Sequence, residues 1–409
     1  ALLYAVRGDD ERGQSFHALF QFQLMGINGA FLTGDLFNLF VFFEILLIAS
    51  YALLVHGGGA ERVRAGLHYV VLNLVGSAFF LLAVGVLYGI TGTLNMADMA
   101  IRVAAAGPDD AALLGAAGLL LLVVFGLKAA FLPLYFWLPK AYASATAPVA
   151  ALFAIMTKVG LYSIIRVYTL IFGDEAGSLA NMANDWLWPI ALLTLALGVI
   201  GALAAVSLQG LLAYLVVVSV GTLLAGIAIG TEQALAAALY YLVHSTWVAG
   251  GLFLLADLIA RQRGDKQALL VQGPALQNPH LLGGLFFFGA IAVAGLPPLS
   301  GFLGKLLLLR SLEPGVQALM LWPVVLGGGL LTLVALSRAG SMLFWRVGLS
   351  QLDSAELDFG RLLACAGLLL LSLVLMVGAA PLLSYVEATA SQLHDLALYR
   401  QIIESGAAR

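Results

Sequence analysis

Long apolar stretches separated by short polar segments run through the chain from end to end. A stretch of about 18 or more apolar residues can cross the hydrocarbon core of a bilayer as a helix. The pattern therefore predicts an all-α, polytopic membrane helix bundle, a single membrane domain over residues 1–409, with eleven spans. The predicted spans cover residues 16–33, 35–55, 67–90, 111–138, 148–172, 187–206, 210–229, 233–260, 281–309, 316–345 and 361–386.

Two of these spans contain helix-breaking residues. The fourth reads "GLKAAFLPLYFWLPK", with Pro133 inside it, and the ninth reads "AVAGLPPLSGFLGK", with Pro297 and Pro298. Proline removes a backbone hydrogen bond and clashes with the preceding turn. Unwound backbone at membrane depth is tolerated only where it is buried in protein or lines a watery cavity. Both spans are therefore expected to be broken helices that mark an ion path.

The order of these features predicts an internal repeat. Residues 16–172 end with a broken helix and then a helix carrying Lys158, and residues 187–345 end with a broken helix and then a helix carrying Arg338. Because each unit has five spans, the second starts from the opposite side of the membrane. The prediction is two inverted five-helix repeats followed by a final span over residues 361–386.

Positive charges in the loops predict the orientation. One set of alternate loops carries nine Lys and Arg residues, whereas the loops between them carry only Arg102 and Arg310. The C-terminal tail adds Arg400 and Arg409. Because cytoplasmic loops are enriched in Lys and Arg, the first set is predicted to be cytoplasmic and the C-terminus to lie outside. The first set comprises residues 7–15, 56–66, 139–147, 207–209, 261–280 and 346–360.

The composition supports a membrane protein without a cofactor. Hydrophobic residues make up 62% of the chain and charged residues 10%, with a mean hydropathy of +1.02. Soluble domains have roughly 45–50% apolar and about 25% charged residues. The single cysteine, Cys365, cannot form an internal disulfide, and no CxxC metal pattern occurs. The sequence carries no haem, iron–sulfur or dinucleotide signature, so no cofactor is expected.

Ionisable residues inside the spans are the candidates for a functional site. Glu44 is the one acidic residue in mid-span, while Asp35 and Asp257 lie at span ends. A charge at the bilayer centre costs about 2.5–3.5 kcal/mol on the insertion scale, so such residues favour an ion or proton path. The basic residues inside spans are Lys128, Lys158, Arg166, His244, Lys305 and Arg338.

Several of these residues have a structural alternative. Arg166 can extend to the membrane interface, and Asp35 can cap the helix that follows it. Arg338 can point to the cytoplasmic end of its span in a structural role, and His244 can be a neutral core histidine. Further polar residues that could line a path are Asn73, Thr157, Tyr240 and Tyr241.

Buried lysines suit proton transfer. Burial disfavours the charged form of a lysine and a nearby carboxylate favours it, so a lysine between these influences can change its protonation state. Lys128 and Lys305 lie five to seven residues from the breaks, where cavities are expected. A row of lysines and a histidine linked by water would form a proton relay.

At these positions the sequence resembles a known family. The segments "TGDLFNLFVFFEILLIASYALL", "LKAAFLPLYFWLPKAYASATAPVAALFAIMTKVGLYSIIR" and "GLPPLSGFLGK" resemble the proton-translocating antiporter-like subunits of respiratory complex I, membrane-bound hydrogenases and Mrp-type cation/proton antiporters. The "GDLFNLFVFFE" and "LVHSTW" segments are most similar to the D-type subunit of Mrp (multiple resistance and pH) antiporters. Family members have fourteen spans, so this chain, which begins without Met, is expected to lack the first three.

The resemblance implies roles for matching positions. Glu44 would pair with Lys128, Lys158 would be the next relay position, His244 the relay histidine, and Lys305 the lysine of the second broken helix. The implied function is the proton-translocating subunit of a multi-subunit Na⁺ or K⁺/proton antiporter, a transporter rather than an enzyme. Its expected setting is the bacterial inner membrane, with other antiporter subunits as partners and no nucleic acid.

Two alternatives stay open. The chain could be a membrane subunit of a redox-driven pump, such as complex I or a membrane-bound hydrogenase. Complex I relatives often carry a lysine four residues after the histidine, where this sequence has Val248, and this departure weakens that assignment. The chain could also be a structural or assembly subunit whose buried charges have no transport role.

Overall fold

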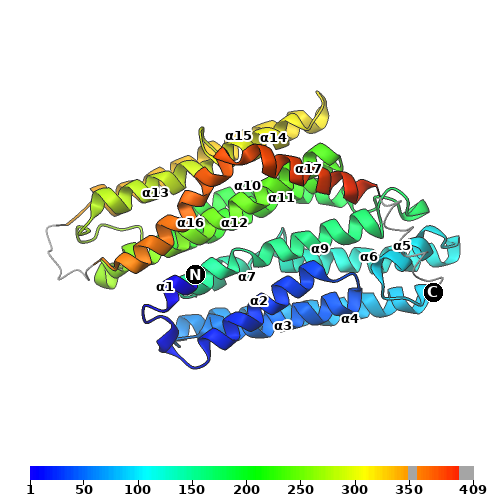
Figure 1. Ribbon diagram of the computed structural model, residues 1–409, viewed down its shortest axis with the longest axis horizontal. Helices are drawn as coiled ribbons and strands as arrows, with labels where there is room; N and C mark the ends of the chain where they lie inside the picture. The colour runs from blue at the N-terminus through cyan, green and yellow to red at the C-terminus, as the bar shows by residue number, and fades with distance from the viewer. Residues whose placement is uncertain (349–356, 396–409) are drawn as a thin grey trace.

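Helices lie side by side along the long axis of the molecule (Figure 1). The computed structural model describes residues 1–348 and 357–395, so the C-terminal tail and most of the predicted loop 346–360 lie outside the described residues. Within the described residues, nine helical stretches are long and apolar enough to cross a membrane. The predicted helix bundle is confirmed.

The first half of the chain starts with the short helix α1 (Leu2–Ala5) and ends with α9. Asp35 begins α3 as predicted, because its Oδ1 accepts a hydrogen bond from the backbone N of Asn38 at 2.8 Å. Two short helices were not predicted: α5, whose first turn is capped by Asn95, and α7, most of which lies in the predicted loop 139–147. The helices after α1 are α2 (Phe16–Leu32), α3 (Leu36–Val55), α4 (Ala60–Thr91), α5 (Met96–Ala104), α6 (Pro108–Ala129), α7 (Trp137–Ser144), α8 (Ala147–Phe153) and α9 (Met156–Leu170).

The second half runs from α10 to α15, and two further helices follow it. The predicted last span, 361–386, proves to be two helices that meet at Gly378, and Figure 1 shows the bend between them. The elements are α10 (Asn184–Ala204), α11 (Leu208–Ile229), α12 (Glu232–Arg261), α13 (Pro279–Ala294), α14 (Ser300–Arg310), α15 (Val316–Gly340), a π-helical turn (Ser341–Trp345), α16 (Phe359–Val377) and α17 (Ala379–His394).

Both predicted helix breaks are present, and they share one backbone pattern. α6 ends before Ala130, with φ of 60°, and α13 ends before Gly295, with φ of 80°; each residue is followed three positions later by a proline. This pattern aligns Ala130 with Gly295. Lys128 consequently precedes its break, on α6, whereas Lys305 follows its break, on α14. The two lysines are not equivalent positions of the repeat, because they lie on opposite sides of their breaks.

A second shared feature shows that the two halves run in opposite directions. An isolated antiparallel bridge joins Asp35 to Asn95 in the first half and Ser207 to Leu269 in the second. Each bridge is held by two backbone hydrogen bonds of 2.8–2.9 Å, and the two bridges lie directly before α3 and α11. The first bridge lies where α2 ends, and the second lies at the opposite end of the bundle, where α10 ends. The two halves therefore carry the same feature at opposite ends of the bundle, as an inverted repeat predicts.

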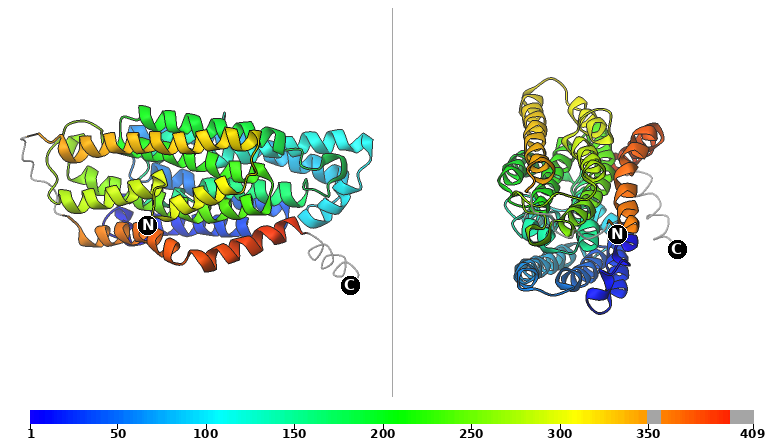
Figure 2. Two further views of the ribbon diagram at one scale, coloured as in Figure 1. Left: turned by 90° about the horizontal axis from the view of Figure 1, so that it is seen from above. Right: turned by 90° about the vertical axis from the view of Figure 1, so that its left-hand side faces the viewer.

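The loops predicted to share one side of the membrane do meet at one end of the bundle. A common pocket there is lined by residues from five segments: before α2, between α3 and α4, between α7 and α8, at the start of α11 and after α12. We call this the arginine-rich end; it is marked by Asp9, Arg62 and Arg261. Figure 2 gives the end-on view from the left-hand side of Figure 1.

The fifth predicted span is interrupted. α8 ends at Phe153 and α9 begins at Met156, so residues 148–172 do not form one continuous helix. Ile155 N donates to Leu152 O at 3.3 Å, three residues back rather than four, which tightens the chain locally without any proline. The interruption comes just before Lys158. In the α8–α9 stretch and in α11, 83% of the most apolar 18 residues are buried inside the protein, so these helices are shielded from lipid.

Candidate functional site

The four basic residues of the predicted relay lie in the interior of the bundle. The exposed fraction is 4% for Lys128, 0% for Lys158, 1% for His244 and 9% for Lys305. Glu44 is half-buried. Because a buried charge without a partner is costly, the hydrogen-bond partners of each side chain decide what it can do.

Glu44 and Lys128 are joined through a serine hydroxyl. Ser77 Oγ donates to Glu44 Oε1, and Lys128 Nζ donates to Ser77 Oγ at 3.3 Å. Within residues 1–348 and 357–395, the glutamate and the lysine form no direct ion pair. The predicted pairing of these two residues is therefore indirect.

Helix α4 presents two polar groups to Lys128 from successive turns. Asn73 and Ser77 are four residues apart and so lie on one face of the helix. Lys128 Nζ donates to Asn73 Oδ1 at 3.3 Å as well as to the serine. Gly76 makes the close approach possible, because a Cβ there would lie 2.5 Å from Leu127 Cδ2. The predicted polar residue Asn73 thus does contact Lys128.

Lys158 points from α9 towards α11. Its Nζ donates to Ser219 Oγ at 3.2 Å. Two residues further along α9, Gly160 brings this helix onto the end of α6, since a Cβ at Gly160 would lie 2.5 Å from the backbone N of Ala129. The helices that carry Lys128 and Lys158 are therefore in direct backbone contact.

His244 joins α12 to the second helix break. Its Nδ1 and Ser300 Oγ are 2.8 Å apart, and Ser300 is the first residue of α14. His244 and Ser219 both line a cavity of about 20 Å³, together with Tyr241 and Val293. A space of this size holds about one water molecule. The cavity therefore connects the surroundings of Lys158 with those of His244.

Lys305 lies across the second break. Its Nζ donates to Val293 O at 3.1 Å and to Ala294 O at 2.9 Å, two of the last carbonyls of α13. The C-terminal end of a helix carries a partial negative charge, which favours a cation there. Val293 also lines the cavity next to His244, so the lysine contacts a residue of the cavity wall.

The remaining predicted residues lie outside this series. Arg338 donates to Ala205 O at 2.8 Å and so caps α10, as the structural interpretation of that residue required. Tyr240 donates to Leu375 O at 3.2 Å. Thr157 Oγ1 is buried with no hydrogen-bond partner among the described residues. Arg166 is half-buried.

Sequence analysis missed the serines that contact the relay. Ser77, Ser219 and Ser300 each lie on a helix adjacent to a relay residue. A serine inside an apolar span is common and carries no desolvation penalty large enough to mark it. The one available signal was the spacing of four residues between Asn73 and Ser77. Gln23, buried in α2 without a side-chain partner among the described residues, was also missed.

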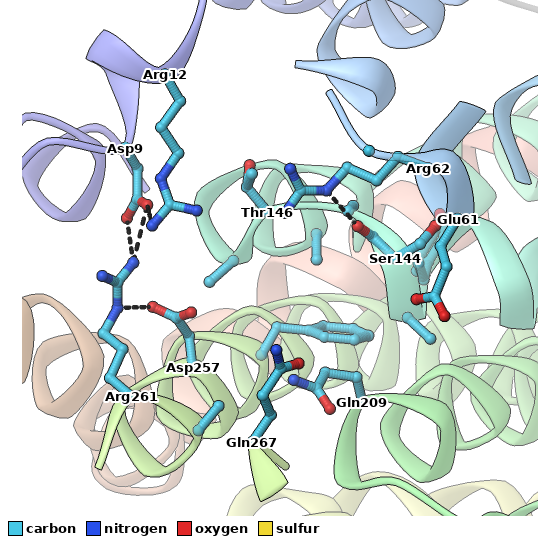
Figure 3. A pocket seen from close by; sticks show the side chains of 18 of the residues that line it. Asp9, Arg12, Glu61, Arg62, Ser144, Thr146, Gln209, Asp257, Arg261 and Gln267 are labelled. Atoms are coloured by element: carbon cyan, nitrogen blue, oxygen red, sulfur yellow. Dashed lines mark hydrogen bonds and ion pairs between the residues drawn. The ribbon is translucent and has the colours of Figure 1, made fainter. Parts of the chain in front are cut away.

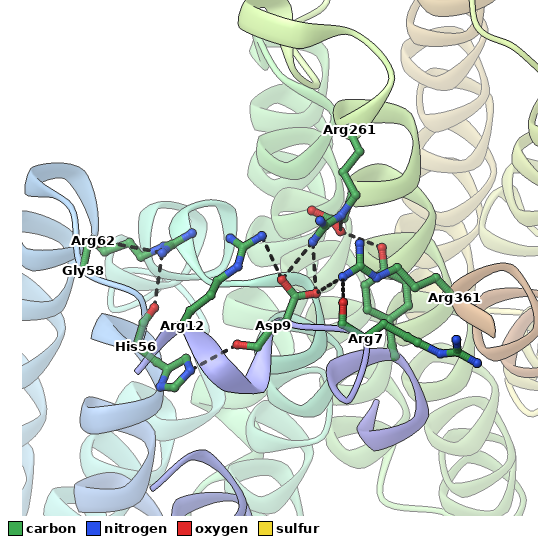
Figure 4. A network of polar contacts seen from close by, with 10 residues as sticks. Arg7, Asp9, Arg12, His56, Gly58, Arg62, Arg261 and Arg361 are labelled. Atoms are coloured by element: carbon green, nitrogen blue, oxygen red, sulfur yellow. Dashed lines mark hydrogen bonds and ion pairs between the residues drawn. The ribbon is translucent and has the colours of Figure 1, made fainter. Parts of the chain in front are cut away.

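A network of arginines surrounds one buried aspartate at the arginine-rich end (Figure 4). Asp9 is 1% exposed and contacts Arg12 at 3.0 Å, Arg261 at 2.8 Å and Arg361 at 3.5 Å. Asp257, predicted at a span end, accepts from Arg261 and from Tyr4. The network ties the segment before α2 to the end of α12 and the start of α16.

A pocket of about 580 Å³ opens beside this network (Figure 3). Arg62, Gln209 and Gln267 point into it from three segments. Its wall includes Phe253 on α12, and the neighbouring Leu252 lines the small cavity beside His244. The pocket and the cavity therefore both border α12, at adjacent residues.

Comparison with known proteins adds a family and several relatives. The sequence profile described as NADH:quinone oxidoreductase/Mrp antiporter, transmembrane, matches residues 33–334. A probable D-type subunit of a K⁺/H⁺ antiporter of Rhizobium meliloti is 42% identical over 96% of this chain and 78% of that protein. A D-type subunit of a Na⁺/H⁺ antiporter of Bacillus subtilis is 44% identical over 74% of this chain and 61% of that protein.

Two solved structures share the fold. The Mrp complex from Dietzia sp. contains a chain with a TM-score of 0.83 and 26% identity, covering 98% of this chain and 82% of that one. The membrane-bound sulfane sulfur reductase, an archaeal respiratory membrane complex, contains a chain with a TM-score of 0.82 and 26% identity, covering 94% of this chain and 77% of that one.

Proposed function

Because the chain belongs to the NADH:quinone oxidoreductase/Mrp antiporter transmembrane family, we propose that it is the proton-translocating subunit of a multi-subunit monovalent cation/proton antiporter. Protons would pass along Glu44, Lys128, Lys158, His244 and Lys305. The names of the relatives support antiport with Na⁺ or K⁺.

One observation carries this proposal. Buried ionisable side chains form a series across both halves, and each has a polar partner on another helix or across a break. The first member reaches Glu44 through a hydroxyl, and the cavity of about 20 Å³ bridges the middle members. Titratable groups that are buried and linked by hydroxyls or water are what a proton relay needs.

The proposed function implies a membrane location, an orientation and a repeat structure for the chain. We place the chain in the inner membrane of a bacterium, with the arginine-rich end in the cytoplasm, the C-terminus outside and other antiporter subunits as partners. The Lys and Arg content of that end supports the orientation. Residues 16–172 and 187–345 are proposed as the two inverted repeats. The pocket of about 580 Å³ would supply water and protons from the cytoplasm.

A second candidate function is supported by the likeness to the sulfane sulfur reductase. The chain would then move protons in response to a redox reaction in partner subunits. Cation-dependent proton flux in vesicles, measured without any electron donor, separates the two: an antiporter responds to added Na⁺ or K⁺, and a redox-driven pump does not.

Replacement of Lys305 tests the relay itself. Lys305→Gln keeps a donor for the α13 carbonyls but can neither take up nor release a proton. We expect the complex to assemble at wild-type level while cation-driven pH change in vesicles is abolished. Lys140→Gln, at an exposed position of α7, is the matched control and should keep full flux. Wild-type flux in Lys305→Gln would remove Lys305 from the relay, and loss of assembly would make it structural.

A further inference from the structure

Ser77 contacts both the acidic and the basic end of the predicted Glu44–Lys128 pair. Its hydroxyl donates to Glu44 Oε1 and accepts from Lys128 Nζ, and the residue is 7% exposed. A serine hydroxyl offers one donor and two acceptor sites, so both contacts can exist together. The hydroxyl is also shielded from bulk water, which leaves it as the direct link between the lysine and the glutamate.

We propose that Ser77 passes the proton between Lys128 and Glu44, an inference that rests on the proposed function. An Nζ–H bond of protonated Lys128 breaks as its proton moves to Ser77 Oγ. The original O–H bond of Ser77 breaks at the same time, and the serine's own proton moves to Glu44 Oε1. The ammonium becomes an amine and the carboxylate becomes a neutral acid. The serine ends with one proton, as it began.

The neighbouring polar residue cannot do this. Asn73 also accepts a hydrogen bond from Lys128, but through an amide oxygen that has no proton to hand on. Its amide nitrogen donates to Tyr69 O at 3.0 Å, which fixes the side chain in that orientation. Asn73 therefore positions the lysine, and Ser77 is the group through which the proton moves.

The serine beside Lys158 has a different arrangement. Ser219 accepts from Lys158, but its own hydroxyl donates to Val216 O at 2.7 Å, a carbonyl of its own helix. That proton is directed to a group that does not titrate. Ser77 is distinguished because both of its partners are ionisable.

A pair of nearly isosteric substitutions isolates the hydroxyl. Ser77→Thr keeps the hydroxyl, whereas Ser77→Val has a methyl group where threonine has the hydroxyl and otherwise the same shape. We expect Ser77→Thr to retain most of the cation-driven proton flux and Ser77→Val to lose about 10²-fold or more, the scale of a lost proton-transfer group. The pH profile of the residual flux should also change in the valine variant alone.

Ser163 provides the matched control pair. It is buried on α9 and its hydroxyl donates to Val159 O, so Ser163→Thr and Ser163→Val should behave alike. Equal flux in the two Ser77 variants, at any level, would overturn the inference. The Lys305→Gln variant separates this from the proposed function: if Lys305→Gln is inactive while the Ser77 variants are equal, only the role of Ser77 falls.

Discussion

At the scale of single residues, the bundle tolerates buried lysines by surrounding them with oxygen atoms. Lys128 has the side chains of Asn73 and Ser77, and Lys305 has two terminal carbonyls of α13. These partners accept hydrogen bonds from the protonated lysine but do not lock it in that state, because none of them carries a full negative charge. A lysine held this way can gain and lose a proton more readily than one locked in a direct ion pair.

Substitutions of Glu44 test whether its charge matters. Glu44→Asp draws the carboxylate back from Ser77 by one methylene, so part of the flux should survive with an altered pH optimum. Glu44→Gln keeps the size but cannot accept a proton, and it should resemble Glu44→Ala. The expected order of cation-driven pH change, at equal subunit levels, is wild type > Asp > Gln ≈ Ala. Asp110→Asn, at an exposed site, serves as control. A fully active Gln variant would exclude a role for the charge.

His244 is the next residue whose chemistry can be isolated. His244→Ala removes the group between the cavity and Ser300, so we expect proton flux to fall by about 10²-fold or more, in line with the loss of an acid–base group. His244→Lys should retain part of the flux, because a lysine can also hold and pass a proton. His68→Ala, at an exposed position of α4, should have no effect. Equal flux in wild type and His244→Ala would refute the relay role.

At the scale of elements, close helix packing sets the position of Lys158 relative to Lys128. A Cβ at Gly160 would lie 2.5 Å from the backbone N of Ala129, which cannot move aside as a side chain could. Gly160→Ala should therefore push α9 away from α6, destabilise the protein by about 1–3 kcal/mol and reduce flux. The readouts are thermal unfolding in detergent and vesicle transport.

A glycine elsewhere supplies the control for that prediction. Gly85 on α4 has open space where a Cβ would be, so Gly85→Ala should be neutral or slightly stabilising. If Gly160→Ala unfolds at the wild-type temperature and transports normally, the contact between α9 and α6 does not determine the spacing of the two lysines.

The elements also show where sequence reasoning succeeds and where it stops. Helix starts such as that of α3 were predictable because a capping side chain such as Asp35 is visible in the sequence. The break before Ala130 was predictable from Pro133. The interruption between α8 and α9 was not, because neither proline nor glycine marks residues 153–156. The contact of Ser77 with Lys128 depends on how α4 meets α6, and no local pattern encodes that approach.

At the scale of the whole molecule, Asp9 holds three segments together at the arginine-rich end through ion pairs. They are the segment before α2, the end of α12 and the start of α16. Asp9→Asn would leave Arg12, Arg261 and Arg361 close together without their shared counter-charge. We expect a loss of roughly 3 kcal/mol in the free energy of unfolding, as for a buried ion pair that loses one partner. Because Arg12 is 41% exposed, water offsets part of this cost. Thermal unfolding in detergent measures it.

The control for Asp9 is an exposed ion pair at another site. Asp98 and Arg102 form a pair at 3.1 Å on the surface of α5. Asp98→Asn should change stability by less than about 1 kcal/mol. If Asp9→Asn is no more destabilising than Asp98→Asn, the arginine network does not hold the segments together.

The small cavity beside His244 would allow proton transfer but exclude Na⁺ and K⁺. At about 20 Å³ it has room for a single water molecule, and much of its lining is aliphatic. Na⁺ and K⁺ cross proteins where several oxygens replace their hydration shell, whereas the described side chains that line this cavity supply three hydroxyls, from Ser219, Tyr241 and Ser245, and no carboxylate. A proton needs no shell, because it hops between groups that stay in place. In the proposed antiporter the alkali metal ion would consequently travel by another route. Proton transport and cation transport would then be coupled electrostatically rather than through a shared pore.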